Sequence, residues 1–123
     1  MDFQTLNSLA EYTQANIHNR ASVSTILDSA EKVALAACHL EKALRDATAA
    51  IEAAAADAQV CLARVKEGAA LISDIADDFE CRVNPRLASF PSESIARAKS
   101  EYLAAKVEWD GVRKMHNIPD RFQ

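Results

Sequence analysis

The sequence predicts an all-α protein: one long central helix, a C-terminal antiparallel helix that forms a helical hairpin with it, and a short N-terminal helix. Only two glycines and three prolines occur among the 123 residues, so few positions favour turns. Half of the residues are hydrophobic but only 6% are aromatic, which predicts a thin core of small side chains. The third observation is a heptad pattern through nearly half of the chain. A chain of this length is one ordinary domain, so we predict a single helical domain over residues 1–123, with helices at about 3–15, 22–81 and 91–116.

The long helix is predicted from a heptad seam between Val23 and Phe79. Residues at alternating spacings of three and four are apolar or glycine throughout this span, which is the period of a helix packed along one face. Gly68 is the one glycine on the seam and costs about 1 kcal/mol of helix propensity, so it marks a place where a kink or break can occur. The seam positions are Val23, Ile26, Ala30, Val33, Ala37, Leu40, Leu44, Ala47, Ile51, Ala54, Ala58, Cys61, Val65, Gly68, Ile72, Ile75 and Phe79.

The middle of this helix, from Thr48 to Ala58, is rich in alanine. Alanine maintains the helix but contributes little buried area, and it lets a second helix approach closely. The two flanking helices are too short to cover the whole seam, so this stretch is the predicted site of self-association or of binding to a partner helix. We therefore predict Ile51, Ala54 and Ala58 as partner-binding residues.

The predicted N-terminal helix, residues 3–15, rests on apolar residues at helical spacing from Phe3 to Ile17. Asn16, Asn19 and Ser22 are capping residues and predict a turn before the long helix. Because no glycine or proline interrupts this region, a helix that runs straight through is the alternative.

The C-terminal helix follows a predicted loop over residues 83–91, where Asn84-Pro85 ends the long helix. Its apolar stripe from Ile95 to Val112 has heptad spacing, and Pro119 stops it. The tail after Asn117 carries Ile118 and Phe122; we expect it to fray, with docking against the hairpin as the alternative.

Two aromatic residues and three cations of this helix are further predicted partner-binding residues. The cations recur every seven residues beside the aromatic rings, and tryptophan, tyrosine and arginine are common at binding hot spots. The alternative is that the rings are the large core residues of the hairpin. The residues are Lys99, Tyr102, Lys106, Trp109 and Arg113.

Charge and composition narrow the classes of partner. The formal net charge of −4 argues against nucleic acid. No apolar run reaches the roughly 20 residues that a membrane helix needs, and the N-terminus does not resemble a secretory signal, so we expect a cytoplasmic protein with no membrane partner. The three cysteines, Cys38, Cys61 and Cys81, form no metal or redox motif, so we expect free thiols, no metal and no cofactor.

The segment His39-Leu40-Glu41-Lys42 follows an apolar helical run and resembles the H-x-x-K core of histidine phosphotransfer domains, which are helical bundles of about this size. The resemblance implies phosphoryl acceptance by His39, with the cation of Lys42 one turn away. It covers these residues alone, and Ala43 stands where that family usually has glycine. The alternative is a histidine on the solvated face of the helix.

No other catalytic pattern is found in the sequence, so we expect a protein that is not an enzyme. The first hypothesis is a small helical interaction module that binds a larger protein, as an adaptor, chaperone, immunity protein or virus-encoded inhibitor does. The second is a self-assembling coiled-coil subunit, and the third is histidine phosphotransfer through His39. The expected partner is another protein, a further copy of the chain, or both, with a homodimer as the expected oligomer.

Overall fold

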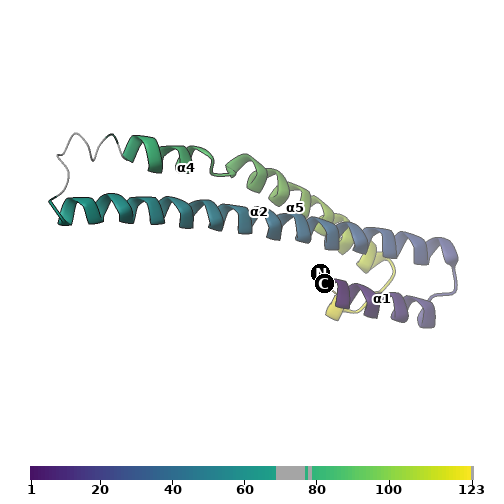
Figure 1. Cartoon of the computed structure of the whole chain (residues 1–123). Coiled ribbons are helices and arrows are strands. Elements are labelled where there is room, and N and C mark those ends of the chain that lie inside the picture. The colour runs from purple at the N-terminus through teal and green to yellow at the C-terminus, as the bar shows by residue number, and fades with distance from the viewer. Residues whose placement is uncertain (69–76, 78, 123) are drawn as a thin grey trace. The chain divides into compact units, whose positions relative to one another are not determined.

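The computed structural model describes residues 1–68, 77 and 79–122, and these residues form helices and no strand (Figure 1). The predicted all-α class, the long central helix and the antiparallel C-terminal helix are confirmed. The elements are α1 (Phe3–Asn16), α2 (Arg20–Lys66), a π-helical turn η1 (Phe79–Val83), α4 (Asn84–Ala88), α5 (Ser92–Met115) and a 3-10 turn η2 (Asp120–Phe122).

Helix α1 begins with a capping carboxylate. The Asp2 side chain accepts a hydrogen bond from the backbone N–H of Thr5 at 2.7 Å, which satisfies one of the free N–H groups of the first turn. Because this bond stabilises the ionised carboxylate, it lowers the pKa of Asp2 below its usual value of 3.8.

A turn separates α1 from α2, which excludes the continuous helix that the sequence left open. Ile17 is extended, and Asn19 caps the next helix. Its side-chain oxygen accepts hydrogen bonds from the N–H groups of Ala21 at 2.9 Å and Ser22 at 3.3 Å.

Helix α2 ends at Lys66, so the prediction of one continuous helix over 22–81 is wrong. Gly68 has a φ of +65°, a left-handed conformation that glycine adopts without steric cost, and its N–H bonds to the carbonyl of Val65 at 3.0 Å. The glycine on the seam is therefore a helix terminator. The predicted seam positions Ile72 and Ile75 lie outside the described residues.

The predicted loop over 83–91 is also corrected, because most of it is helical. Pro85 lies in the first turn of α4, where its missing N–H costs no helical hydrogen bond. The break follows Ala88, and α5 starts at Ser92. Pro85 therefore lies just after the point where the π-helical turn η1 passes into α4, and it does not end a helix.

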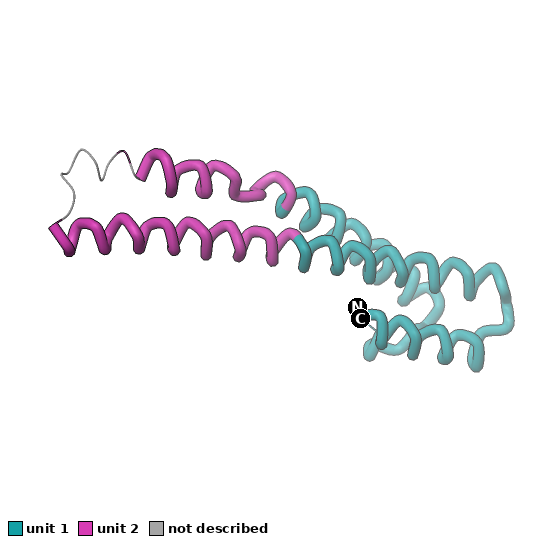
Figure 2. Tube along the Cα trace, viewed as in Figure 1, with its two compact units in different colours: residues 1–42, 95–123 teal, residues 43–94 magenta. Residues whose placement is uncertain are grey.

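The chain divides into two compact units (Figure 2). Unit 1 comprises Met1–Lys42 and Ile95–Gln123, and unit 2 comprises Ala43–Ser94. Both contain part of α2, so the single-domain organisation stays a prediction.

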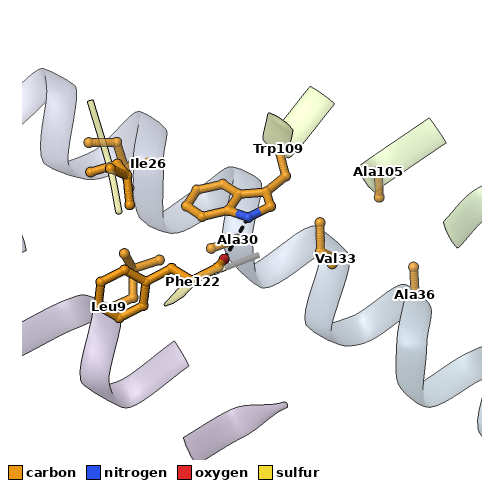
Figure 3. Packing of buried hydrophobic residues seen from close by; sticks show 9 residues of the cluster. Leu9, Ile26, Ala30, Val33, Ala36, Ala105, Trp109 and Phe122 are labelled. Atoms are coloured by element: carbon orange, nitrogen blue, oxygen red, sulfur yellow. Dashed lines mark hydrogen bonds between the residues drawn. The ribbon is translucent and has the colours of Figure 1, made fainter. Parts of the chain in front are cut away.

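In unit 1, α5 runs antiparallel to α2. Nζ of Lys32 lies 3.3 Å from a carboxylate oxygen of Glu108. Nδ1 of His39, seven residues after Lys32, lies 3.7 Å from a carboxylate oxygen of Glu101, which is seven residues before Glu108. Between these helices and α1 lies one apolar core around Trp109, whose side chain is fully buried (Figure 3). The buried core residues are Leu9, Ile26, Ala30, Val33, Ala36, Ala105, Trp109, Ile118 and Phe122.

The C-terminal tail docks against this core, so the expected fraying is wrong. Asn117 has a φ of +55°, and the N–H of Ile118 bonds back to the carbonyl of Arg113 at 2.9 Å, the pattern of a Schellman helix end. Phe122 is buried, and its carbonyl accepts a hydrogen bond from Nε1 of Trp109 at 2.9 Å. A pair between Arg113 Nη1 and Asp120 Oδ1 at 2.5 Å holds the turn.

Unit 2 is built from the second part of α2, η1 and α4. Arg86 of α4 donates to Asp57 of α2 at 3.2 Å, which places the two helices side by side (Figures 1 and 2). The described buried hydrophobic residues of this unit are Ala43, Ala47, Ala54, Cys61 and Val83. They are small side chains, so the burial is shallow.

Candidate interaction surface

The heptad seam of α2 separates into two rows in unit 2. One row, Ala47, Ala54 and Cys61, is buried. The other row is open: Leu44 is 49% exposed, Ile51 is 55% and Val65 is 46%. The helix therefore packs with one half of its predicted seam and presents the other half to solvent.

The open row belongs to a second continuous heptad seam. Its residues alternate at spacings of four and three, are exposed or half-buried, and carry no charge. Over this span the helix is about 31 Å long at 1.5 Å per residue. We call this surface the open seam; its residues are Leu44, Thr48, Ile51, Ala55, Ala58, Leu62 and Val65.

The single polar member of the open seam is compatible with burial. The hydroxyl of Thr48 donates to the carbonyl of Leu44, one turn earlier, at 2.9 Å. A hydroxyl that is already bonded loses little when it leaves water. The open seam can therefore be covered by an apolar helix without leaving an unsatisfied polar side chain.

The predicted α2 site residues fall on both rows. Ile51 and Ala58 belong to the open seam, whereas Ala54 is only 5% exposed and belongs to the buried row. The structure thus brings two of the three to one accessible surface and commits Ala54 to the interior of unit 2. The neighbouring residues Leu44 and Leu62 extend the surface at both ends.

The predicted α5 site residues do not form one exposed patch. Trp109 and Arg113 are buried, and Tyr102 packs against the core of unit 1. Lys106 is half-buried, and its Nζ lies 3.9 Å from Oδ1 of Asp110. Lys99 is exposed. Trp109 and Arg113 instead hold the docked tail, through hydrogen bonds to Phe122 and Asp120.

An apolar ridge on the outer side of α5 was missed by the sequence reasoning. Leu103, Val107 and Met115 are 51%, 74% and 77% exposed. They recur at multiples of four residues, with Gly111 in the intermediate position, so they line up along the helix. The signal was present in the sequence as a second apolar spacing beside the heptad.

His39 lies on a groove of unit 1 between α2 and α5. The groove has a volume of about 400 Å³, and its apolar residues include Leu35 and Ala36. Nδ1 of His39 is 3.7 Å from a carboxylate oxygen of Glu101, and the imidazole is 59% exposed. The ring is accessible for chemistry, but the adjacent carboxylate repels an incoming phosphoryl group.

The cysteines, the potential metal ligands and the polarity of the helices also bear on function in the described residues. Cys38, Cys61 and Cys81 are free, as expected. No group of three or more potential metal ligands occurs within residues 1–68, 77 and 79–122. In the same part of the chain, every helix is too short or too polar to cross a lipid bilayer.

Comparison with protein-family models, with curated proteins and with solved structures finds no significant match to this chain.

Proposed function

We propose that this protein is a small, non-catalytic helical interaction module whose open seam binds a helix of a protein partner. The main observation behind this proposal is the uncharged, exposed seam from Leu44 to Val65. Contiguous apolar surface of this kind is typical of interaction sites, and a row at spacings of four and three matches an amphipathic helix laid along it. The bound helix belongs to another protein or to a further copy of the chain.

The shallow core of unit 2 supports the same proposal. Its described buried residues are small, so its apolar burial is limited, while leucine and isoleucine side chains stay in water. Each of these larger side chains contributes about 1.5–3 kcal/mol when fully buried. Binding along the open seam would therefore add apolar burial to the described part of unit 2.

Two matched substitutions on α2 test the proposal. Leu62 is 44% exposed on the open seam, and Val60 is 43% exposed nearly on the opposite side of the helix. Leu62→Glu puts a charge into the seam, whereas Val60→Glu adds the same charge outside it. A tagged chain co-expressed with an untagged copy is captured, and the proteins that return in comparable amounts are identified.

We expect the wild type and Val60→Glu to retain a protein that Leu62→Glu loses, with all three showing the same helical circular dichroism. A retained protein that differs from this chain supports the adaptor, chaperone, immunity-protein or inhibitor hypothesis. Return of the untagged copy alone supports the self-assembling subunit. If Leu62→Glu retains as much as Val60→Glu, the open seam is not the binding surface.

We place this activity in the cytoplasm, because free thiols such as Cys38 and Cys81 persist in a reducing compartment. The net charge of −4 again favours a protein partner over nucleic acid.

Histidine phosphotransfer through His39 is the competing proposal, favoured by the accessible imidazole. Incubation with a small-molecule phosphodonor distinguishes the two. The interaction module predicts no labelling of the wild type, whereas phosphotransfer predicts labelling that His39→Gln abolishes.

A further inference from the structure

The order of side-chain sizes along the open seam identifies its occupant. We propose that the seam binds the same seam of a second copy of this chain, with the two α2 helices antiparallel about a two-fold axis at Ala55. The inference rests on the proposed function, because it assigns a partner to that surface. A two-fold interface uses one patch twice, so the patch must complement its own reversed sequence.

The open seam has this property. About a two-fold axis at Ala55, Thr48 lies level with Leu62 of the second copy, and Ala55 lies level with itself. Leu44 then lies within one residue of the level of Val65 of the second copy, and Ile51 lies within one residue of the level of its Ala58. The layers are then Leu with Val, Thr with Leu, Ile with Ala and Ala with Ala, so their combined size decreases gradually from the ends to the centre without an abrupt step.

A parallel, in-register pair is disfavoured by the same side chains. It would place Ile51 against Ile51 in one layer and alanine against alanine in the next two, at Ala55 and Ala58. Wide layers hold the backbones apart, so the alanine layers between them would leave a void. Antiparallel pairing avoids this void by placing Ile51 over Ala58. The central alanines then allow close approach of the two helices.

The chemistry of the surface fits a helix of the same composition. None of its seven side chains is charged, so pairing buries no ionised group within the seam. The Thr48 hydroxyl keeps its hydrogen bond to the carbonyl of Leu44 within its own helix. Larger apolar residues lie toward both ends, so the contact extends over the full length of about 31 Å.

Association is tested first by sedimentation equilibrium of the full chain at micromolar concentrations. The expected mass is twice the 13.4 kDa of one chain. Leu62→Glu should weaken association by about 100-fold or more, because each interface would bury two unpaired carboxylates, whereas Val60→Glu should leave it unchanged. A wild type that stays monomeric overturns the second copy as occupant, and so does a Leu62→Glu variant that still dimerises as the wild type does.

Orientation is tested by disulfide formation in a background with Cys38, Cys61 and Cys81 replaced by alanine. Antiparallel pairing puts the two Thr48 positions of a dimer about 21 Å apart, far beyond the reach of a disulfide. A Thr48→Cys chain should therefore not cross-link to itself. The Thr48→Cys chain, mixed with a Leu62→Cys chain that carries a tag of different length, should form a disulfide-linked heterodimer. The same mixture with a Val60→Cys chain in place of the Leu62→Cys chain should form none. Self-linking of Thr48→Cys indicates parallel helices and overturns the proposal.

The interaction module and the second copy as its occupant are tested separately. The wild type can be monomeric and yet capture a different protein, which Val60→Glu retains and Leu62→Glu loses. That result supports the interaction module and excludes the second copy as its occupant. If the chain dimerises but the Thr48 and Leu62 positions do not link, the proposed antiparallel seam is excluded.

Discussion

Unit 1 and unit 2 bury different kinds of side chain, although α2 has the same heptad period in both. Unit 1 encloses Trp109 together with leucine, isoleucine, valine and phenylalanine. The described part of unit 2 buries alanines, one cysteine and one valine, and leaves Leu44, Ile51 and Leu62 in contact with solvent. A continuous heptad therefore does not guarantee a continuous core.

The difference lies in the size of the side chains that are buried on α2 and around it. Two neighbouring elements and a docked tail bring large side chains onto α2 in unit 1. In unit 2, alanines such as Ala47 and Ala54 let the neighbouring chain come close but add little buried area. Unit 1 should accordingly hold most of the stability of the isolated chain, and unit 2 should depend more on association.

The largest expected effect is in the core of unit 1. Trp109→Ala should lower the free energy of unfolding by about 3–5 kcal/mol, because it leaves a cavity in a fully buried site. Urea unfolding followed by circular dichroism measures this loss. Trp109→Phe should cost less than Trp109→Ala, because it keeps a ring in the core, although it also removes the hydrogen bond to the carbonyl of Phe122. A loss below 1 kcal/mol for Trp109→Ala would contradict the assignment of stability to unit 1.

The next effect compares two isoleucines on the same helix. Ile26 is fully buried in unit 1, and Ile51 is 55% exposed in unit 2. Ile26→Ala should cost about 2–5 kcal/mol, whereas Ile51→Ala should change the stability of the monomer by about 0.5 kcal/mol or less. Both are made in the Leu62→Glu background, so that association does not contribute. Equal losses would show that unit 2 has a core as strong as that of unit 1.

A smaller effect compares the two glycines. Gly111 is helical and nothing lies within 4 Å of an added Cβ, so Gly111→Ala should stabilise α5 by about 0.5–1 kcal/mol. Gly68 has open space around it but a φ of +65°, so Gly68→Ala should destabilise the end of α2 by about 1 kcal/mol. Thermal unfolding of the two variants should shift in opposite directions. Shifts of the same sign would refute the role of Gly68 as a helix terminator.

The smallest effect is at the exposed start of unit 1. The pKa of Asp2 is lowered by its hydrogen bond to Thr5, so its stabilising contribution is present above its usual pKa of 3.8. The contribution is lost as the pH falls through the lower pKa of the folded state. Asp2→Ala should therefore destabilise α1 slightly at neutral pH and make no difference in strong acid. Chemical shifts of the Thr5 amide during an acid titration follow this change, and a titration unaffected by Asp2→Ala would exclude the cap.

The helix ends show where sequence reasoning succeeded and where it stopped. Asn19 was recognised as a capping residue, and the turn before α2 is present. The docked tail was given only as the alternative to fraying, although Asn117, an apolar Ile118 and then Pro119 form a readable helix-end signature. Pro85 was misread because proline is compatible with both the end of one helix and the first turn of the next.

The sequence by itself determined the fold class, because the scarcity of glycine and proline and the period of the apolar residues act locally along the helix. It also identified Ile51 and Ala58 as seam positions of the long helix. Only the tertiary structure decided which half of the seam is buried, and that Trp109 and Arg113 serve the interior. Burial depends on which elements pack against a helix face, and those neighbours come from distant parts of the chain whose arrangement the heptad period does not specify.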